Sequence, residues 1–280
     1  MISIVQQLKR DKLAMIGAII IFFLAGIAIL APYIAPYDAI ELDLKNRLSP
    51  PDRNHLMGTD NLGRDVFSRI IYGTRISLSM ATVVVMIVML LGIAMGTIAG
   101  YCGGIIDGAI MRMVDVLLAF PNIILALVIA GILGPSLTNV MIALSAIWWV
   151  SYARIIRGSV LSVKEKEFVE AVRAMGCSDA SIAVRHVLPN VLSPVIVLAT
   201  LDMGHIILSI AALSFLGLGA QPPIPEWGTM LNEGRPFMET APHLMIFLGL
   251  MIMVVVLAFN FLGDGLRDAL DPRMKEVMMK

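Results

Sequence analysis

The sequence has little charge, few aromatic residues and almost no cysteine. Charged residues make up 15% of its 280 residues and balance to a net charge of zero, so the overall charge gives no sign of a nucleic-acid partner. The two cysteines, Cys102 and Cys177, are too few for a disulfide framework, and we interpret them as small apolar residues. Hydrophobic residues make up 58% of the chain and the mean hydropathy is +0.87, which excludes an ordinary soluble domain.

The sequence also lacks the residue patterns of nucleotide-binding and zinc sites. No lysine follows a glycine, so the Gly-Lys-Ser/Thr end of a phosphate-binding loop is absent. The histidines are scattered without zinc-ligand spacing, at His55, His186, His205 and His243. We therefore expect a chain that is not itself an enzyme and binds no cofactor of its own.

Six apolar segments are each long enough to cross a membrane, which takes about 20 residues. The predicted spans are 13–37, 76–106 with its start near Met80, 111–133, 137–156, 187–216 and 241–263. A turn at Gly134-Pro135-Ser136 separates the third span from the fourth. The basic residues before Leu13 leave a cleaved signal peptide as an alternative. The apolar stretch is longer than a usual signal core, so we interpret it as an uncleaved first span. The predicted fold class is an all-α membrane protein with six transmembrane helices.

The distribution of Lys and Arg predicts the orientation of these spans. With the N-terminus in the cytosol, the inner segments hold 14 basic residues and the outer segments hold 7. The inner residues are Lys9, Arg10, Lys12, Arg112, Arg154, Arg157, Lys164, Lys166, Arg173, Arg185, Arg267, Arg273, Lys275 and Lys280. Both termini are therefore predicted to be cytosolic.

A polar stretch, 170–189, lies between two long apolar runs and is predicted to stay outside the bilayer on the cytosolic side. Its composition favours a short helix, a break at Gly176 and a second helix. Ala171, Val172 and Met175 are predicted to share one face of the first helix. Glu170 lies near the start of that helix, where a negative charge suits the helix dipole. Such a segment is suited to docking against a soluble partner.

Four motifs carry a resemblance to a known family. Residues 170–176 read E-A-V-R-A-M-G and are followed by Leu188-Pro189, which resembles the EAA loop of permease subunits of ABC importers. Residues 57–78 read M-G-T-D-N-L-G-R-D-V-F-S-R-I-I-Y-G-T-R-I-S-L and resemble the signature before the second helix in C-type permeases of the peptide/nickel branch. Residues 212–228, A-L-S-F-L-G-L-G-A-Q-P-P-I-P-E-W-G, and 260–273, N-F-L-G-D-G-L-R-D-A-L-D-P-R, resemble the same branch. Together these motifs cover the chain nearly end to end.

The resemblance implies a type I ABC importer permease fold in a prokaryotic inner or plasma membrane. It implies an N-terminal part, 1–75, with the first span and outer loop, and a five-helix core, 76–280, with a coupling loop at about 158–190. The implied partners are a homologous second permease, two cytosolic ATPase subunits that use ATP and Mg, and an extracytoplasmic substrate-binding protein. The residues implied in coupling to the ATPase subunits are Glu170, Ala171, Ala174, Gly176, Leu188 and Pro189.

Two ionisable residues, Asp202 and His205, lie three apart on one face of the fifth span. Ionisable groups at that depth are costly and face a cavity or a partner. One interpretation is a polar lining of the translocation path, and the other is a mutual hydrogen bond or a pairing with the second permease. Imidazole and carboxylate also suit transient contact with a metal, although two groups do not make a firm metal site. The predicted cargo is nickel, a metal chelate or a small peptide, with a preference for the metal.

Another class of function stays open beside the importer. A self-sufficient channel or secondary transporter also consists of apolar spans with ionisable residues inside them. Secondary carriers often show repeated halves with paired charges at mid-membrane, and no internal repeat is evident in this sequence. The 170–189 segment would also have no docking role in such a protein.

Three local predictions concern the outer loops and the third span. Thr59 and Asp60 are predicted to cap a connecting helix that runs through Tyr72. The proline-rich run at 222–225 is predicted to form an outer turn, with Trp227 near the membrane interface. Asp115 is predicted to pair with Arg112, three residues away.

Overall fold

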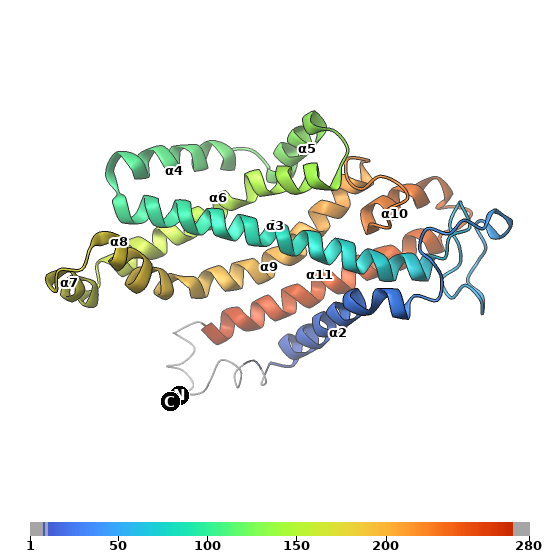
Figure 1. The fold of residues 1–280 in the computed structure, drawn as a ribbon, viewed down its shortest axis with the longest axis horizontal. Coiled ribbons are helices and arrows are strands. Elements are labelled where there is room, and N and C mark those ends of the chain that lie inside the picture. The colour runs from blue at the N-terminus through green and yellow to red at the C-terminus, as the bar shows by residue number, and fades with distance from the viewer. Residues whose placement is uncertain (1–7, 9–10, 271–280) are drawn as a thin grey trace.

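The computed structural model describes residue 8 and residues 11–270, and within them all regular secondary structure is helical (Figure 1). The helices are α2 (Lys12–Ile34), α3 (Val66–Cys102), α4 (Gly104–Leu118), α5 (Asn122–Leu133), α6 (Leu137–Lys164), α7 (Glu167–Ala174), α8 (Asp179–Ser181), α9 (Leu188–Phe215), α10 (Trp227–Gly234) and α11 (His243–Leu270). Short turns of other helix types are η1 (Leu44–Asn46), η2 (Ile182–Val187) and η3 (Arg235–Phe237). The predicted all-α fold class is confirmed.

Five helices of the described chain are long and apolar enough to cross a membrane. They are α2, α3, α6, the run Asp179–Phe215 that includes α8, η2 and α9, and α11. These correspond to the predicted first, second, fourth, fifth and sixth spans. The predicted third span differs, because α4 and α5 meet at an angle of 89° and count as one span only if the bent pair is taken together.

The break between α4 and α5 has a physical cause in the sequence. Pro121 has no backbone N–H to donate, and it disfavours helical backbone at the residue before it. Helix α4 therefore ends at Leu118, and α5 starts at Asn122 in a new direction. The predicted third span over 111–133 is therefore a bent pair of helices in the structure, not one continuous helix.

Helix α3 is a single helix of 37 residues that contains both the predicted connecting helix and the predicted second span. It begins at Val66 because the Asp65 carboxylate accepts a hydrogen bond from the Ser68 backbone N–H at 2.8 Å, which caps the first turn. The prediction of Thr59 and Asp60 as caps was wrong, since both lie in the loop before this helix.

Helices α3 and α6 pack closely along their length, with glycine at the points of contact. Gly92, Gly96 and Gly100 are spaced by four residues, so they lie on one face of α3. A Cβ added at Gly96 would lie 2.6 Å from the Ala153 carbonyl oxygen, and one at Gly100 would lie 2.9 Å from the Val160 Cβ. The absent side chains let the two backbones approach, which is how membrane helices gain packing contacts.

Figure 1 places the two sets of connecting segments at opposite ends of the molecule. Helices α7 and α8 lie at one end, and the 35–65 loop with α10 lies at the other. Helix α11 packs between α2 and α9. Five basic residues used in the orientation count, Lys9, Arg10, Arg273, Lys275 and Lys280, lie outside the described residues.

Candidate functional site

The 170–189 segment folds as the predicted short helix, glycine break and second helix. Helix α7 ends at Ala174, and Gly176 has a φ of +83°, a left-handed conformation that other residues rarely adopt. The chain then enters α8 and η2, which run into α9 without a loop. The segment is therefore joined directly to a membrane-spanning helix.

The buried face of α7 consists of Val169 and Val172. Ala171 is exposed and Met175 is 73% exposed, so the prediction that Val172 shares their face was wrong. Val172 follows Val169 by three residues and packs toward the protein, whereas Ala171 and Met175, four apart, point to solvent.

The predicted coupling residues lie mostly on the solvent side of this segment. Those exposed are Glu170, Ala171, Ala174, Gly176 and Pro189, and Leu188 is half-buried. A Cβ built on Gly176 meets no other atom within 4 Å. Small residues and the exposed Met175 therefore make up this part of the surface.

Asp202 and His205 lie three residues apart on the same side of α9, as predicted, and differ in exposure. The Asp202 side chain is 13% exposed and the His205 side chain is 64% exposed. The His205 Nδ1 and Asp202 Oδ1 atoms are 3.6 Å apart, which is too long for a direct hydrogen bond. The described residues contain no group of three His, Cys, Asp or Glu side chains that could hold a metal ion. The pair can thus present a polar surface but not a complete metal site.

Two ion pairs join α4 to α6. Arg157 Nη2 donates to Asp107 Oδ2 at 2.6 Å, and Arg154 pairs with Asp115. The predicted partner of Asp115, Arg112, was therefore wrong, because the basic residue comes from the facing helix. Arg154 and Asp115 are both more than half exposed, so their pair contributes little stability.

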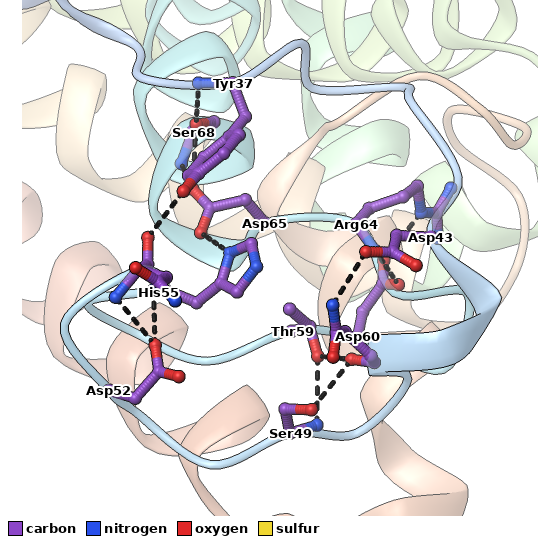
Figure 2. Close-up of polar contacts among 12 residues, drawn as sticks. Tyr37, Asp43, Ser49, Asp52, His55, Thr59, Asp60, Arg64, Asp65 and Ser68 are labelled. Atoms are coloured by element: carbon purple, nitrogen blue, oxygen red, sulfur yellow. Dashed lines mark hydrogen bonds and ion pairs between the residues drawn. The ribbon is translucent and has the colours of Figure 1, made fainter.

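At the opposite end, the loop before α3 is held by a network of side-chain hydrogen bonds (Figure 2). The Asp65 carboxylate is at its centre, with His55 Nδ1 at 2.9 Å and the Ser68 hydroxyl donating at 2.8 Å. The Thr59 hydroxyl accepts from the Ser49 backbone N–H at 2.9 Å. Residues of the 57–78 motif therefore fix the shape of this loop.

A buried cluster of four charges joins the loop, α3 and α10. Arg64 Nε lies 2.6 Å from Asp60 Oδ2, and Arg64 Nη2 lies 2.9 Å from Glu233 Oε2. Arg69 pairs with the same two carboxylates, at 2.9 Å from Glu233. Both arginine side chains are 1% exposed. The two acids and two bases neutralise one another, although Arg69 Nε and Nη2 are buried without a hydrogen-bond partner among the described residues.

The family models decide what kind of protein has this geometry. Residues 90–276 match the model described as binding-protein-dependent transport system inner membrane component. The chain belongs to this family. Residues 2–51 match a second model, the N-terminal TM domain of oligopeptide transport permease C. The chain is thus an ABC importer permease of the peptide/nickel family, a multi-pass inner-membrane subunit.

Individual relatives of this permease are similar over nearly their whole length. A dipeptide transport system permease protein from Alkalihalophilus pseudofirmus is 49% identical over 270 residues, which are 96% of this chain and 89% of the relative. A glutathione transport system permease protein from Pectobacterium atrosepticum is 46% identical over 271 residues, 96% of this chain and 90% of the relative.

A solved structure of the MetNI methionine ABC transporter in an inward-facing conformation contains a chain of the same fold. The TM-score is 0.59 at 19% identity, and the match covers 73% of this permease and 98% of that chain. The type I importer permease fold expected from the sequence is confirmed.

The permease buries Trp227 and Glu226 at the start of α10. Trp227 has no exposed surface, and its indole N–H donates to the Ile70 carbonyl of α3 at 3.3 Å, so it packs inside the protein. The Glu226 carboxylate caps α10 by accepting from the Thr229 backbone N–H at 2.9 Å. Burial raises the pKa of Glu226, because a charged carboxylate loses its hydration there.

The raised pKa of Glu226 predicts a pH-dependent stability. A group whose folded-state pKa is raised stabilises the fold fully below its unfolded-state pKa, and this contribution is lost as pH rises through the folded-state pKa. Replacing Glu226 by glutamine keeps the capping oxygen without the charge. We expect Glu226→Gln to raise the Tm in detergent by about 2–4 °C at about pH 8 and to change it little at about pH 4. An equal shift at both pH values would contradict this assignment.

Proposed function

We propose that this permease pairs with a homologous second permease to form the path of a short peptide or glutathione across the membrane. In this proposal two cytosolic ATPase subunits use ATP and Mg, and a substrate-binding protein delivers the cargo from outside. The chain itself is the non-catalytic membrane subunit, with both termini in the cytosol. The observation that carries the proposal is the run Asp179–Phe215, which joins the exposed 170–189 segment, the docking segment, to a helix with Asp202 and His205 in its middle.

The coupling residues follow from the exposed segment. We infer that Glu170, Ala171, Ala174 and Gly176 lie against an ATPase subunit, and that Leu188 and Pro189 pass its movement into α9. Small residues suit this role because they let the partner approach the backbone closely. Rigid-body movement of a docked segment is an established way to transmit a conformational change.

Peptide cargo is favoured over the metal preferred from sequence alone. The names of the two relatives described above state dipeptide and glutathione transport. Two ionisable side chains at 3.6 Å do not complete a metal site, but they can exchange hydrogen bonds with the charged ends of a peptide. We therefore assign Asp202 and His205 to the polar lining of the path.

Uptake by the complete transporter tests the path. The exposed imidazole of His205 is expected to contribute about one hydrogen bond to the moving cargo, so His205→Ala should lower uptake of labelled dialanine or glutathione about two- to tenfold. Leu208→Ala is the matched control, because Leu208 is also exposed, about one turn further along α9. Equal uptake by His205→Ala and wild type, at matched protein levels, would contradict a role of His205 in the path and leave it a packing residue.

Two further experiments test the alternatives of a metal cargo and of a self-sufficient transporter. Loss of labelled nickel uptake alone in His205→Ala would restore the metal assignment. Cargo uptake by vesicles that contain only this chain, without ATPase subunits, would identify a self-sufficient channel or secondary transporter and overturn the importer proposal.

A further inference from the structure

One side chain, Tyr101, ties the end of α3 to the segment that contains α7 and α8. Its hydroxyl donates to Asp179 Oδ1 at 2.7 Å, and the Lys164 ammonium donates to the Tyr101 carbonyl oxygen at 2.7 Å. The same ammonium lies 5.2 Å from the centre of the Tyr101 ring, within the range of a cation–π contact. Tyr101 is the penultimate residue of α3, Lys164 is the last residue of α6, and Asp179 is the first residue of α8.

The Asp179 carboxylate connects these helix ends to α7 as well. Arg173 Nη2 lies 3.9 Å from the Oδ1 atom that accepts the Tyr101 hydrogen bond. Asp179 follows the N-cap residue Ser178, where a negative charge is favoured by the start of the helix. A single carboxylate therefore contacts side chains from α3 and α7 while it belongs to α8.

The Tyr101–Asp179 hydrogen bond links the docking segment to α3, to which it is not joined along the chain. Helices α7 and α8 pack mainly against η2, which leads into α9. Helix α3 packs along α6 and against α9, and its N-terminal turn, at the opposite end from Tyr101, holds Arg69 of the charge cluster. The Tyr101 hydroxyl thus joins the docking segment directly to the C-terminal end of α3, in addition to the packing of α3 against α9.

We propose that Tyr101 is a positioning residue that passes movement of the docking segment to α3 through Asp179, so that α3 and α9 move together. This inference rests on the proposed coupling function of Glu170–Gly176. It assigns to Tyr101 and Asp179 a role in transport efficiency. Neither residue needs to touch the cargo or ATP for this role.

The sharpest test is Tyr101→Phe, which removes the hydroxyl and keeps the ring, the carbonyl and the cation–π contact. The complete transporter is reconstituted in vesicles, and uptake of labelled dialanine or glutathione is divided by ATP hydrolysed. We expect this ratio to fall about two- to tenfold, the effect of one ordinary hydrogen bond. Tyr33→Phe is the control, because Tyr33 is 86% exposed at the far end of α2.

A double-mutant cycle assigns the effect to the Tyr101–Asp179 contact. Asp179→Ala should lower the ratio as Tyr101→Phe does, and the double variant should be no worse than either single variant. Asp179→Asn keeps an acceptor for the hydroxyl and should stay closer to wild type. Multiplied losses in the double variant would overturn the inference, since the two residues would then act separately.

Ala171→Asp tests the coupling proposal itself, so comparing it with Tyr101→Phe shows which of the two ideas fails. If Ala171→Asp abolishes uptake and Tyr101→Phe has the wild-type ratio, coupling stands and the role of Tyr101 is overturned. If Ala171→Asp also leaves uptake unchanged, the coupling proposal itself fails.

Discussion

Ala171→Asp and Gly176→Asp are each expected to reduce cargo uptake by more than about 100-fold while the permease still accumulates in the membrane. Both positions are exposed, and a Cβ at Gly176 meets no atom within 4 Å, so the isolated chain has room for either side chain. In the proposed complex the new carboxylate is buried against an ATPase subunit without a counter-charge. Burial of an unpaired charge costs several kcal/mol, which is enough to prevent docking.

Gly104→Asp is the matched control for Gly176→Asp. Gly104 also has a positive φ, +57°, and open space around its Cβ position, but it lies at the start of α4 rather than in the docking segment. The backbone strain of the substitution is therefore similar at both sites. Membrane levels are measured by blotting, and uptake and ATP hydrolysis in the complete transporter. Wild-type uptake by Gly176→Asp, or an equal loss in Gly104→Asp, would contradict a docking role.

Gly96→Leu is expected to have the largest effect on stability, at about 3 kcal/mol or more. The added Cβ alone would lie 2.6 Å from the Ala153 carbonyl oxygen, and the Leu side chain extends further into α6. Backbone atoms of α6 cannot move aside without separating the two helices over several turns. We expect a lower yield of folded protein and a lower Tm in detergent.

Gly26→Leu controls for the general effect of a leucine in a membrane helix. Gly26 lies in α2, and a Cβ there meets nothing within 4 Å. Its replacement should leave yield and Tm close to wild type. A Gly96→Leu variant as stable as Gly26→Leu would show that the contact between α3 and α6 is not tight.

Hydropathy predicted most of the fold because a membrane span is a property of a continuous stretch of sequence. It placed α2, α6, α9 and α11 to within a few residues at most ends, and the glycine break at Gly176 followed from local backbone preference. Pro121 was a visible signal for the bend between α4 and α5, but an uninterrupted apolar run outweighed it. The spacing of Gly92, Gly96 and Gly100 was likewise visible, and it marks the contact with α6.

Contacts between distant residues could not be predicted in the same way. Arg64 and Glu233 are 169 residues apart, and no local pattern says that their side chains meet. Trp227 resembled an interface residue because its type is common there, yet the carbonyl of Ile70 provides its hydrogen-bond partner inside the protein. Asp115 had a basic neighbour on its own helix, but the arginine of α6 is its partner.

The continuous helical run from Asp179 to Phe215 also fixes how far His205 moves when Asp179 moves. Its 37 residues span about 55 Å at 1.5 Å per residue, and His205 lies about 39 Å from the end at Asp179. A tilt of about 5° about the Phe215 end displaces Asp179 by about 5 Å and His205 by only about 1 Å on this geometry. In the proposed coupling the helix therefore acts as a reducing lever, so that a movement of about 5 Å at the docking segment becomes one of about 1 Å at His205.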